Sequence, residues 1–157
     1  MLCPLGDTMK LFHHNLEIEL NDAWWAEAKM KDFMPKSSAY RVDLDATKDR
    51  PVFEISIDEV RPVKRNPGVG IFNDSAEASA RARVVSILRG FVADEGIPPV
   101  EVIPEPSDSA FSFKLVAGTH RFYCSLAAGF SHVPAVEGFD INAFNQYGNN
   151  IIAPIEE

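Results

Sequence analysis

The sequence predicts a domain of the α/β or α+β class, in which helices and strands are interleaved along the chain. Short segments alternate apolar and polar residues, as Phe53, Ile55 and Ile57 do, and this is the period of a half-buried strand. Residues 75–95 instead carry apolar side chains at helical spacing, and a second helical pattern follows Gly118. The alternation of these two patterns favours one mixed domain.

The N-terminal part of the chain predicts a strand followed by a helix. Residues 11–20 end in clear alternation and predict one strand. Asn21 or Asp22 is expected to cap a helix that runs to about Met34, where Pro35 stops it. Four residues supply the apolar side of this helix: Trp24, Trp25, Ala28 and Phe33.

The middle of the chain predicts two more strands and a long helix. A short strand is predicted over 39–44, and the alternation over 53–57 predicts the next one. The helix at 75–95 is expected to end where Gly96 and Pro98 follow.

The most informative stretch lies at 111–129 and reads as strand, tight turn and helix. Gly118 is expected to let the backbone bend sharply and approach a ligand closely. Thr119 is expected to cap the helix, which places His120 and Arg121 in its first turn.

That first turn has the chemistry of an anion site. It carries N–H groups without helical acceptors and the positive end of the helix dipole, so cationic side chains there destabilise the helix. A bound phosphate would satisfy the N–H groups, His120 and Arg121 together. The alternative is a plain turn whose His120 and Arg121 are solvated.

The turn and two other segments together resemble the ParB/sulfiredoxin superfamily. In sulfiredoxin the turn reads Gly-Cys-His-Arg, and in ParB partition proteins it is of a Gly-Glu-Arg-Arg type. The two other segments are Ile57-Asp58-Glu59-Val60-Arg61-Pro62 and Gly96-Ile97-Pro98-Pro99-Val100-Glu101-Val102. The resemblance implies a mixed sheet with flanking helices over residues 51–137. Residues 1–50 are then expected to form an extension packed on this core through Trp24 or Trp25, and 138–157 a tail.

The departures from the family narrow the expected function. Thr119 stands where sulfiredoxin has its nucleophilic cysteine, so Gly118, His120 and Arg121 carry over as phosphate-binding residues without the redox chemistry. A partition role is not expected, because 157 residues leave no room for the helix-turn-helix domain of those proteins. The resemblance is instead to stand-alone plasmid- or phage-borne members credited with ATPase and nuclease activity.

The expected site combines a phosphate-binding set with one carboxylate. The set comprises Gly118, Thr119, His120, Arg121, Arg61, Lys64 and Arg65. Hydrolysis also needs a carboxylate that positions water or magnesium, and Glu59 is expected to act with His120 and Arg121. ATP or CTP is the expected ligand or substrate, with magnesium as a cofactor and DNA as a further partner. His13 and His14 are not expected to form a metal site, because adjacent strand residues face opposite sides.

Three functions follow as alternatives. The first is an NTP hydrolase or nuclease linked to a mobile genetic element. The second is a nucleotide-responsive binding or inhibitor module without catalysis. The third is a small-molecule kinase of the serine-kinase type. A catalytic carboxylate near the turn favours the first or the third, and tight binding without turnover favours the second.

Bulk properties limit the partners. A net charge of −8 argues against a surface that binds nucleic acid everywhere, although a local basic cluster around Arg61 is compatible with DNA. No apolar run reaches the length of a membrane span, and the N-terminus has no secretory signal, so the expected location is the cytoplasm. Two cysteines make no disulfide framework. A homodimer is the remaining partner considered.

Overall fold

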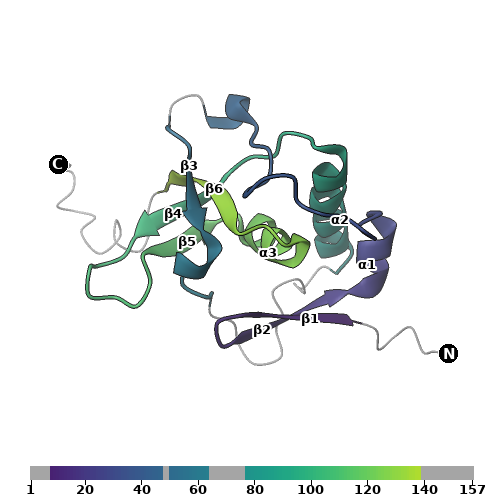
Figure 1. The fold of residues 1–157 in the computed structure, drawn as a ribbon, viewed down its shortest axis with the longest axis horizontal. Coiled ribbons are helices and arrows are strands. Elements are labelled where there is room, and N and C mark those ends of the chain that lie inside the picture. The colour runs from purple at the N-terminus through teal and green to yellow at the C-terminus, as the bar shows by residue number, and fades with distance from the viewer. Residues whose placement is uncertain (1–7, 48–49, 64–76, 139–157) are drawn as a thin grey trace.

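The computed structural model describes residues 8–47, 50–63 and 77–138 (Figure 1). They form a mixed α and β fold, as predicted. The elements are β1 (Thr8–His13), β2 (Leu16–Asn21), α1 (Asp22–Glu27), η2 (Leu44–Thr47), β3 (Phe53–Ser56), η3 (Ile57–Glu59), α2 (Glu77–Ala93), β4 (Val100–Pro104), β5 (Phe113–Ala117), α3 (Thr119–Ala128) and β6 (His132–Glu137), where η denotes a 3-10 helix.

The larger sheet has four strands in the order β3-β6-β4-β5. β4 runs antiparallel to β5 and parallel to β6, and β3 runs antiparallel to β6. The other sheet is the β1–β2 hairpin. In Figure 1, α3 lies between the four-stranded sheet and α2, and α1 lies beside α2. This arrangement makes β5, the following turn and α3 one continuous unit at the edge of the sheet.

One hydrophobic core joins the N-terminal elements to the four-stranded sheet. Trp24 of α1 is buried in it, and Trp25 is half-buried against it. Phe122 and Tyr123 of α3 are the largest side chains that are fully buried. Because burial of each such side chain contributes roughly 1.5–3 kcal/mol, α3 is anchored mainly by its apolar face. None of the described helices combines the length and apolar character needed to traverse a lipid bilayer.

The N-terminal predictions need two corrections. The expected single strand at 11–20 is a hairpin, because His14 adopts a left-handed conformation (φ 57°) and reverses the chain. Asn21 does cap α1, since its side-chain oxygen accepts the Ala23 N–H at 2.7 Å. The helix then ends at Glu27 rather than near Met34, and Lys29 is again left-handed (φ 65°).

The strand expected at 39–44 is absent. The chain makes only an isolated parallel bridge there, between Val42 and Ile97, and η2 follows. The strand predicted over 53–57 agrees closely with β3, which ends at Ser56. The alternation of buried side chains continues into η3, where Ile57 is buried. The long helix is confirmed as α2 from Glu77, and its expected start at Ser75 lies outside the described residues.

A buried histidine ties the hairpin to the rest of the fold. His13 is only 2% exposed, and its Nε2 donates to the Ile57 carbonyl at 3.1 Å. Nδ1 is therefore the acceptor, and the Tyr123 hydroxyl donates to it at 3.2 Å. That hydroxyl in turn accepts the Val63 N–H at 3.2 Å. A neutral imidazole satisfies every group in this network, whereas protonation of Nδ1 would remove the acceptor.

We predict that stability falls as the pH drops below about 6.5. Burial lowers the pKa of His13 from its ordinary value of 6.5, so the unfolded chain takes up a proton before the folded chain does. The contribution of His13 to stability is therefore complete well above pH 6.5, and it is lost as the pH falls from 6.5 through the lower folded-state pKa. Urea unfolding at several pH values between about 7.5 and 5 should show a steeper loss for wild type than for His13→Gln. Equal slopes would contradict the assignment.

Candidate functional site

The turn after β5 has the backbone geometry that the sequence predicts. Gly118 is left-handed (φ 91°), and its carbonyl accepts the Phe122 N–H at 2.9 Å to begin α3. Gly118 itself is the N-cap residue, so Thr119 is the first helical residue rather than the cap. Gly118 has no side chain that could cap the helix, and the first turn contains no acidic residue. The positive end of the helix dipole is therefore not offset by an acidic side chain within this turn.

The structure gives a packing reason for the glycine. A Cβ on Gly118 would lie 3.0–3.1 Å from three atoms of Val100 in the neighbouring strand β4. Such contacts are too short for ordinary packing, and the left-handed φ adds strain for any L side chain. Gly118 is thus required for close approach of the turn to β4, in addition to any approach to a ligand.

Arg121 points to the start of β4. Its Nη1 donates to the Pro99 carbonyl at 2.7 Å, and the residue is half-buried. The adjacent carbonyl of Pro98 accepts the Tyr40 hydroxyl at 2.6 Å. Burial raises the pKa of Tyr40 strongly, and the positive charge of Arg121 opposes that rise only in part. Arg121 and Tyr40 therefore donate hydrogen bonds to the carbonyl groups of two successive prolines.

Arg121 also lines an open groove of about 540 Å³ along α2, which we call the α2 groove. Its polar and apolar lining includes Arg83, Ser86, Ile87, Glu95, Pro98 and Arg121. Gly118, Thr119 and His120 do not line it, although all three are half-buried and His120 Nε2 is shielded from solvent. Among the turn residues predicted to bind phosphate, Arg121 is thus the one that lines the α2 groove.

The structure does not bring Glu59 and Arg61 to this turn. Their backbones meet the other end of β5, because Arg61 N–H donates to the Phe113 carbonyl and Ser112 N–H donates to the Glu59 carbonyl, each at 2.9 Å. The length of β5 separates that end from Gly118. The expected catalytic set of Glu59, His120 and Arg121 is therefore not assembled.

The Arg61 guanidinium has a partner of its own. Its Nε and Nη2 donate to the two carboxylate oxygens of Glu105 at 2.6 and 2.8 Å, and it lies 5.1 Å from the centroid of the Phe111 ring. The hydrogen bond from Arg61 lowers the pKa of Glu105. This bidentate pair ties η3 to the β4–β5 loop. Lys64 and Arg65 lie outside the described residues.

Two carboxylates lie closer to the turn than Glu59 does. Glu95 lines the α2 groove together with Arg121. Glu101 pairs in register with Ala117, but its carboxylate is engaged by Arg50 Nη2 at 3.4 Å. Neither residue was expected at the site, because only the pairing of β4 with β5 and the path of the chain after α2 bring them near the turn. The sequence signal closest to them was the family-like segment that begins at Gly96 and contains Glu101.

No metal centre is found in the part of the chain that the structure describes, where no group of three or more His, Cys, Asp or Glu residues could hold an ion. His13 is satisfied in the core, and His14 Nε2 donates to the Asp58 carbonyl at 2.8 Å. Cys124 is fully buried, and burial raises the pKa of its thiol. A thiol of this kind is an apolar packing group rather than a nucleophile.

No protein-family model matches the chain, and no curated protein or solved structure matches it either. The resemblance to the ParB/sulfiredoxin superfamily and the domain boundaries at 50 and 137 therefore stay predictions.

We predict that Gly118→Ala destabilises the fold more than Gly129→Ala. Both residues are left-handed, so each substitution costs about 1–2 kcal/mol in backbone strain. A Cβ at Gly129 makes only an ordinary contact, 3.5 Å from Pro35, whereas one at Gly118 meets Val100. Gly118→Ala should therefore lose at least about 1 kcal/mol more in urea unfolding. Equal losses would show that β4 does not crowd the turn.

Proposed function

We propose that this protein binds a nucleotide, with the phosphate groups at the first turn of α3 and the rest of the ligand in the α2 groove. The carrying observation is that Arg121 belongs to both places. It is the third residue of α3 and it lines the groove. The first turn follows a glycine cap and contains no acidic residue, so its dipole favours an anion, and Arg121 has N–H groups beyond the one given to Pro99.

The composition of the groove supports a ligand with a charged and a less polar part. Arg83 and Arg121 are cationic, Ser86 offers a hydroxyl, and Ile87 and Pro98 give apolar surface. A sugar or base fits the apolar part while phosphate oxygens meet the arginines. ATP and CTP are the two nucleotides that the sequence resemblance suggests.

The arrangement favours binding without hydrolysis as the first function. The carboxylate expected to position water, Glu59, lies beyond the length of β5 from Arg121. Arg61, expected to neutralise charge, is paired with Glu105. A nucleotide-responsive binding or inhibitor module needs neither residue. The nuclease and kinase alternatives stay predictions, because nothing observed on the fold bears on them.

One observation favours slow NTP hydrolysis as a second candidate. Glu95 lines the same groove as Arg121, so a carboxylate and a guanidinium face one hollow. Glu95 would hold magnesium or orient the water, and Arg121 would stabilise the charge that develops on the transferred phosphoryl oxygens.

We predict that Arg121→Ala weakens ATP or CTP binding by about tenfold or more, because each charge-assisted hydrogen bond contributes roughly 1.5–3 kcal/mol. Arg61→Ala should leave the affinity within about twofold, since Arg61 belongs to the other end of β5. Isothermal titration calorimetry, with and without magnesium, measures both. Lys10→Ala, which removes an exposed cation on β1, serves as the control for net charge.

The opposite result would reject the assignment. If Arg61→Ala weakens binding and Arg121→Ala does not, the phosphate site lies at the other end of β5. Thermal unfolding of Arg121→Ala must be recorded in parallel, because this variant also loses the hydrogen bond to Pro99. Arg121→Lys keeps a cation and a donor, so partial recovery of binding would indicate a role in holding the anion.

We predict that phosphate release from ATP or CTP, where it is measured for wild type, is abolished by Glu95→Gln while nucleotide affinity is retained. Glu59→Gln should not change the rate, because its backbone lies at the far end of β5. A steady-state phosphate assay checks both variants. If Glu59→Gln alone loses phosphate release, Glu59 is the catalytic carboxylate, as the sequence suggested. No release from wild type in the presence of magnesium would leave the binding module as the function.

A further inference from the structure

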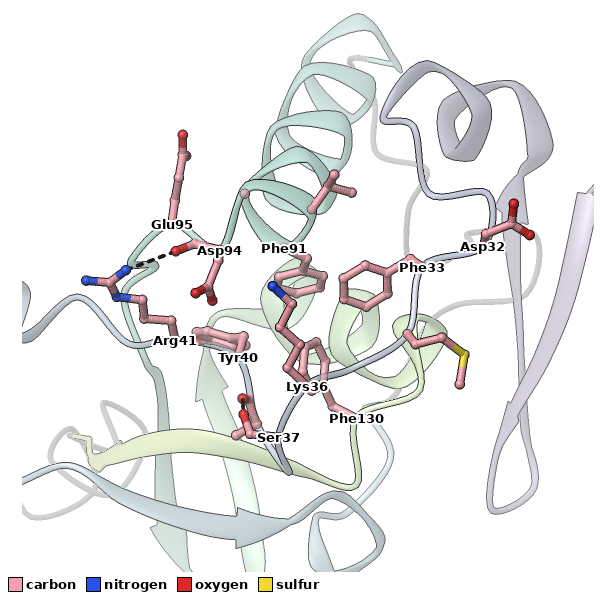
Figure 2. Close-up of a pocket in the computed structure, with 14 residues that line it drawn as sticks. Asp32, Phe33, Lys36, Ser37, Tyr40, Arg41, Phe91, Asp94, Glu95 and Phe130 are labelled. Atoms are coloured by element: carbon pink, nitrogen blue, oxygen red, sulfur yellow. Dashed lines mark hydrogen bonds between the residues drawn. The ribbon is translucent and has the colours of Figure 1, made fainter.

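A second pocket, of about 330 Å³, lies beside the C-terminal end of α2 (Figure 2). Four aromatic rings that contact one another form its apolar part: Phe33, Tyr40, Phe91 and Phe130. We call it the aromatic pocket. Its volume is at the lower end of the range found for small-ligand sites, and it combines an apolar interior with a few polar groups, as such sites do.

The rings are held in place by the fold. Tyr40 and Phe91 stack with centroids 5.5 Å apart, and Phe91 meets Phe130 edge to face at 5.2 Å. The hydroxyl of Tyr40 is occupied by the Pro98 carbonyl, so Tyr40 presents ring rather than hydroxyl to the pocket. The rings are preformed and largely buried, with Tyr40, Phe91 and Phe130 only 5–8% exposed, so they form the floor of the pocket.

Two opposite charges lie at the mouth of this pocket. Figure 2 shows the Asp94 carboxylate and the Lys36 ammonium turned toward the space over the rings, while the side chains of Glu95 and Asp32 point away. Arg41, also at the rim, donates Nη1 to the Asp94 carbonyl at 3.2 Å. Within the described residues, neither the Asp94 carboxylate nor the Lys36 ammonium has an ion pair or a side-chain hydrogen bond. Both charges are thus available to a ligand.

The rim also exposes apolar surface. Met34 is 75% exposed and Val92 is 43% exposed, and both line the pocket. Asp94 is left-handed (φ 57°) at the end of α2, and this conformation directs the chain around the pocket. A ligand that covers the rings, Met34 and Val92 while meeting one charge of each sign would complement all of these groups.

We propose that the aromatic pocket binds a free α-amino acid with a large apolar side chain. Asp94 receives the ammonium group of the ligand, Lys36 receives its carboxylate, and the side chain lies on the four rings. A ligand that carries both charges would meet both of these exposed rim groups, whereas a singly charged ligand would meet only one of them. The proposal uses neither the turn nor Arg121, although Gly90 and Glu95 line both the aromatic pocket and the α2 groove.

The test is a ligand series with the wild-type full chain, followed by ¹H–¹⁵N NMR. The probes are L-phenylalanine, phenethylamine without the carboxylate, 3-phenylpropionate without the ammonium group, and L-alanine without the ring. L-phenylalanine should give saturable shifts at the amides of Tyr40, Phe91 and Asp94. Each of the other three should bind at least about tenfold more weakly, because each lacks one charge-assisted contact or the apolar contact.

Two variants test the charges one at a time. Asp94→Asn keeps a residue that tolerates a left-handed backbone, and Lys36→Met keeps the length of the side chain. Each should weaken L-phenylalanine binding at least about tenfold, whereas Asp108→Asn, an exposed acid in the β4–β5 loop, should not. No saturable shifts with L-phenylalanine, or equal affinity for phenethylamine or 3-phenylpropionate, would overturn the proposal. So would unchanged affinity in both Asp94→Asn and Lys36→Met.

Discussion

The carbonyl groups of Pro98 and Pro99 fix how the parts of this molecule meet. Neither proline has an N–H to donate, so the segment before β4 is held through its acceptors. Tyr40 donates to the first carbonyl at 2.6 Å and Arg121 to the second at 2.7 Å. These two bonds join the N-terminal third of the chain, the start of β4 and the first turn of α3. They also place Arg121 and Tyr40 on two different pockets.

This constraint is compatible with the second role that we propose for the Arg121 guanidinium. One of its five N–H groups is given to Pro99, and the others are compatible with an anion in the α2 groove. A residue that is already held by the fold loses little conformational freedom when a ligand binds, so its contacts are pre-organised. The same hydrogen bond contributes to the fold, so the stability of Arg121→Ala must be measured together with its affinity for nucleotide.

The sequence predicted the strand–turn–helix at 111–129 well, but it predicted poorly which residues lie near that turn. Gly118 was predicted at a sharp bend before a helix, and it is left-handed because only glycine reaches such φ values without strain. The His14 turn was missed because it contains neither glycine nor proline, and the bridge at Val42 was taken for a strand. Glu59 and Arg61 were grouped with the turn because both sequence segments resemble one family. The length of β5 separates them from the turn, and Glu95 instead lines the α2 groove with Arg121 through contacts that no local pattern reveals.

The most direct measurement of the central claim is a ¹H–¹⁵N NMR titration of the full chain with ATP and with CTP, in the presence and absence of magnesium. If the first turn of α3 and the α2 groove bind the nucleotide, the largest amide shifts occur at 119–121 and along 83–90. Comparable shifts at 59–61 and 105–112 would place the ligand at the other end of β5 and contradict the account. No saturable shifts up to millimolar nucleotide would contradict it as well.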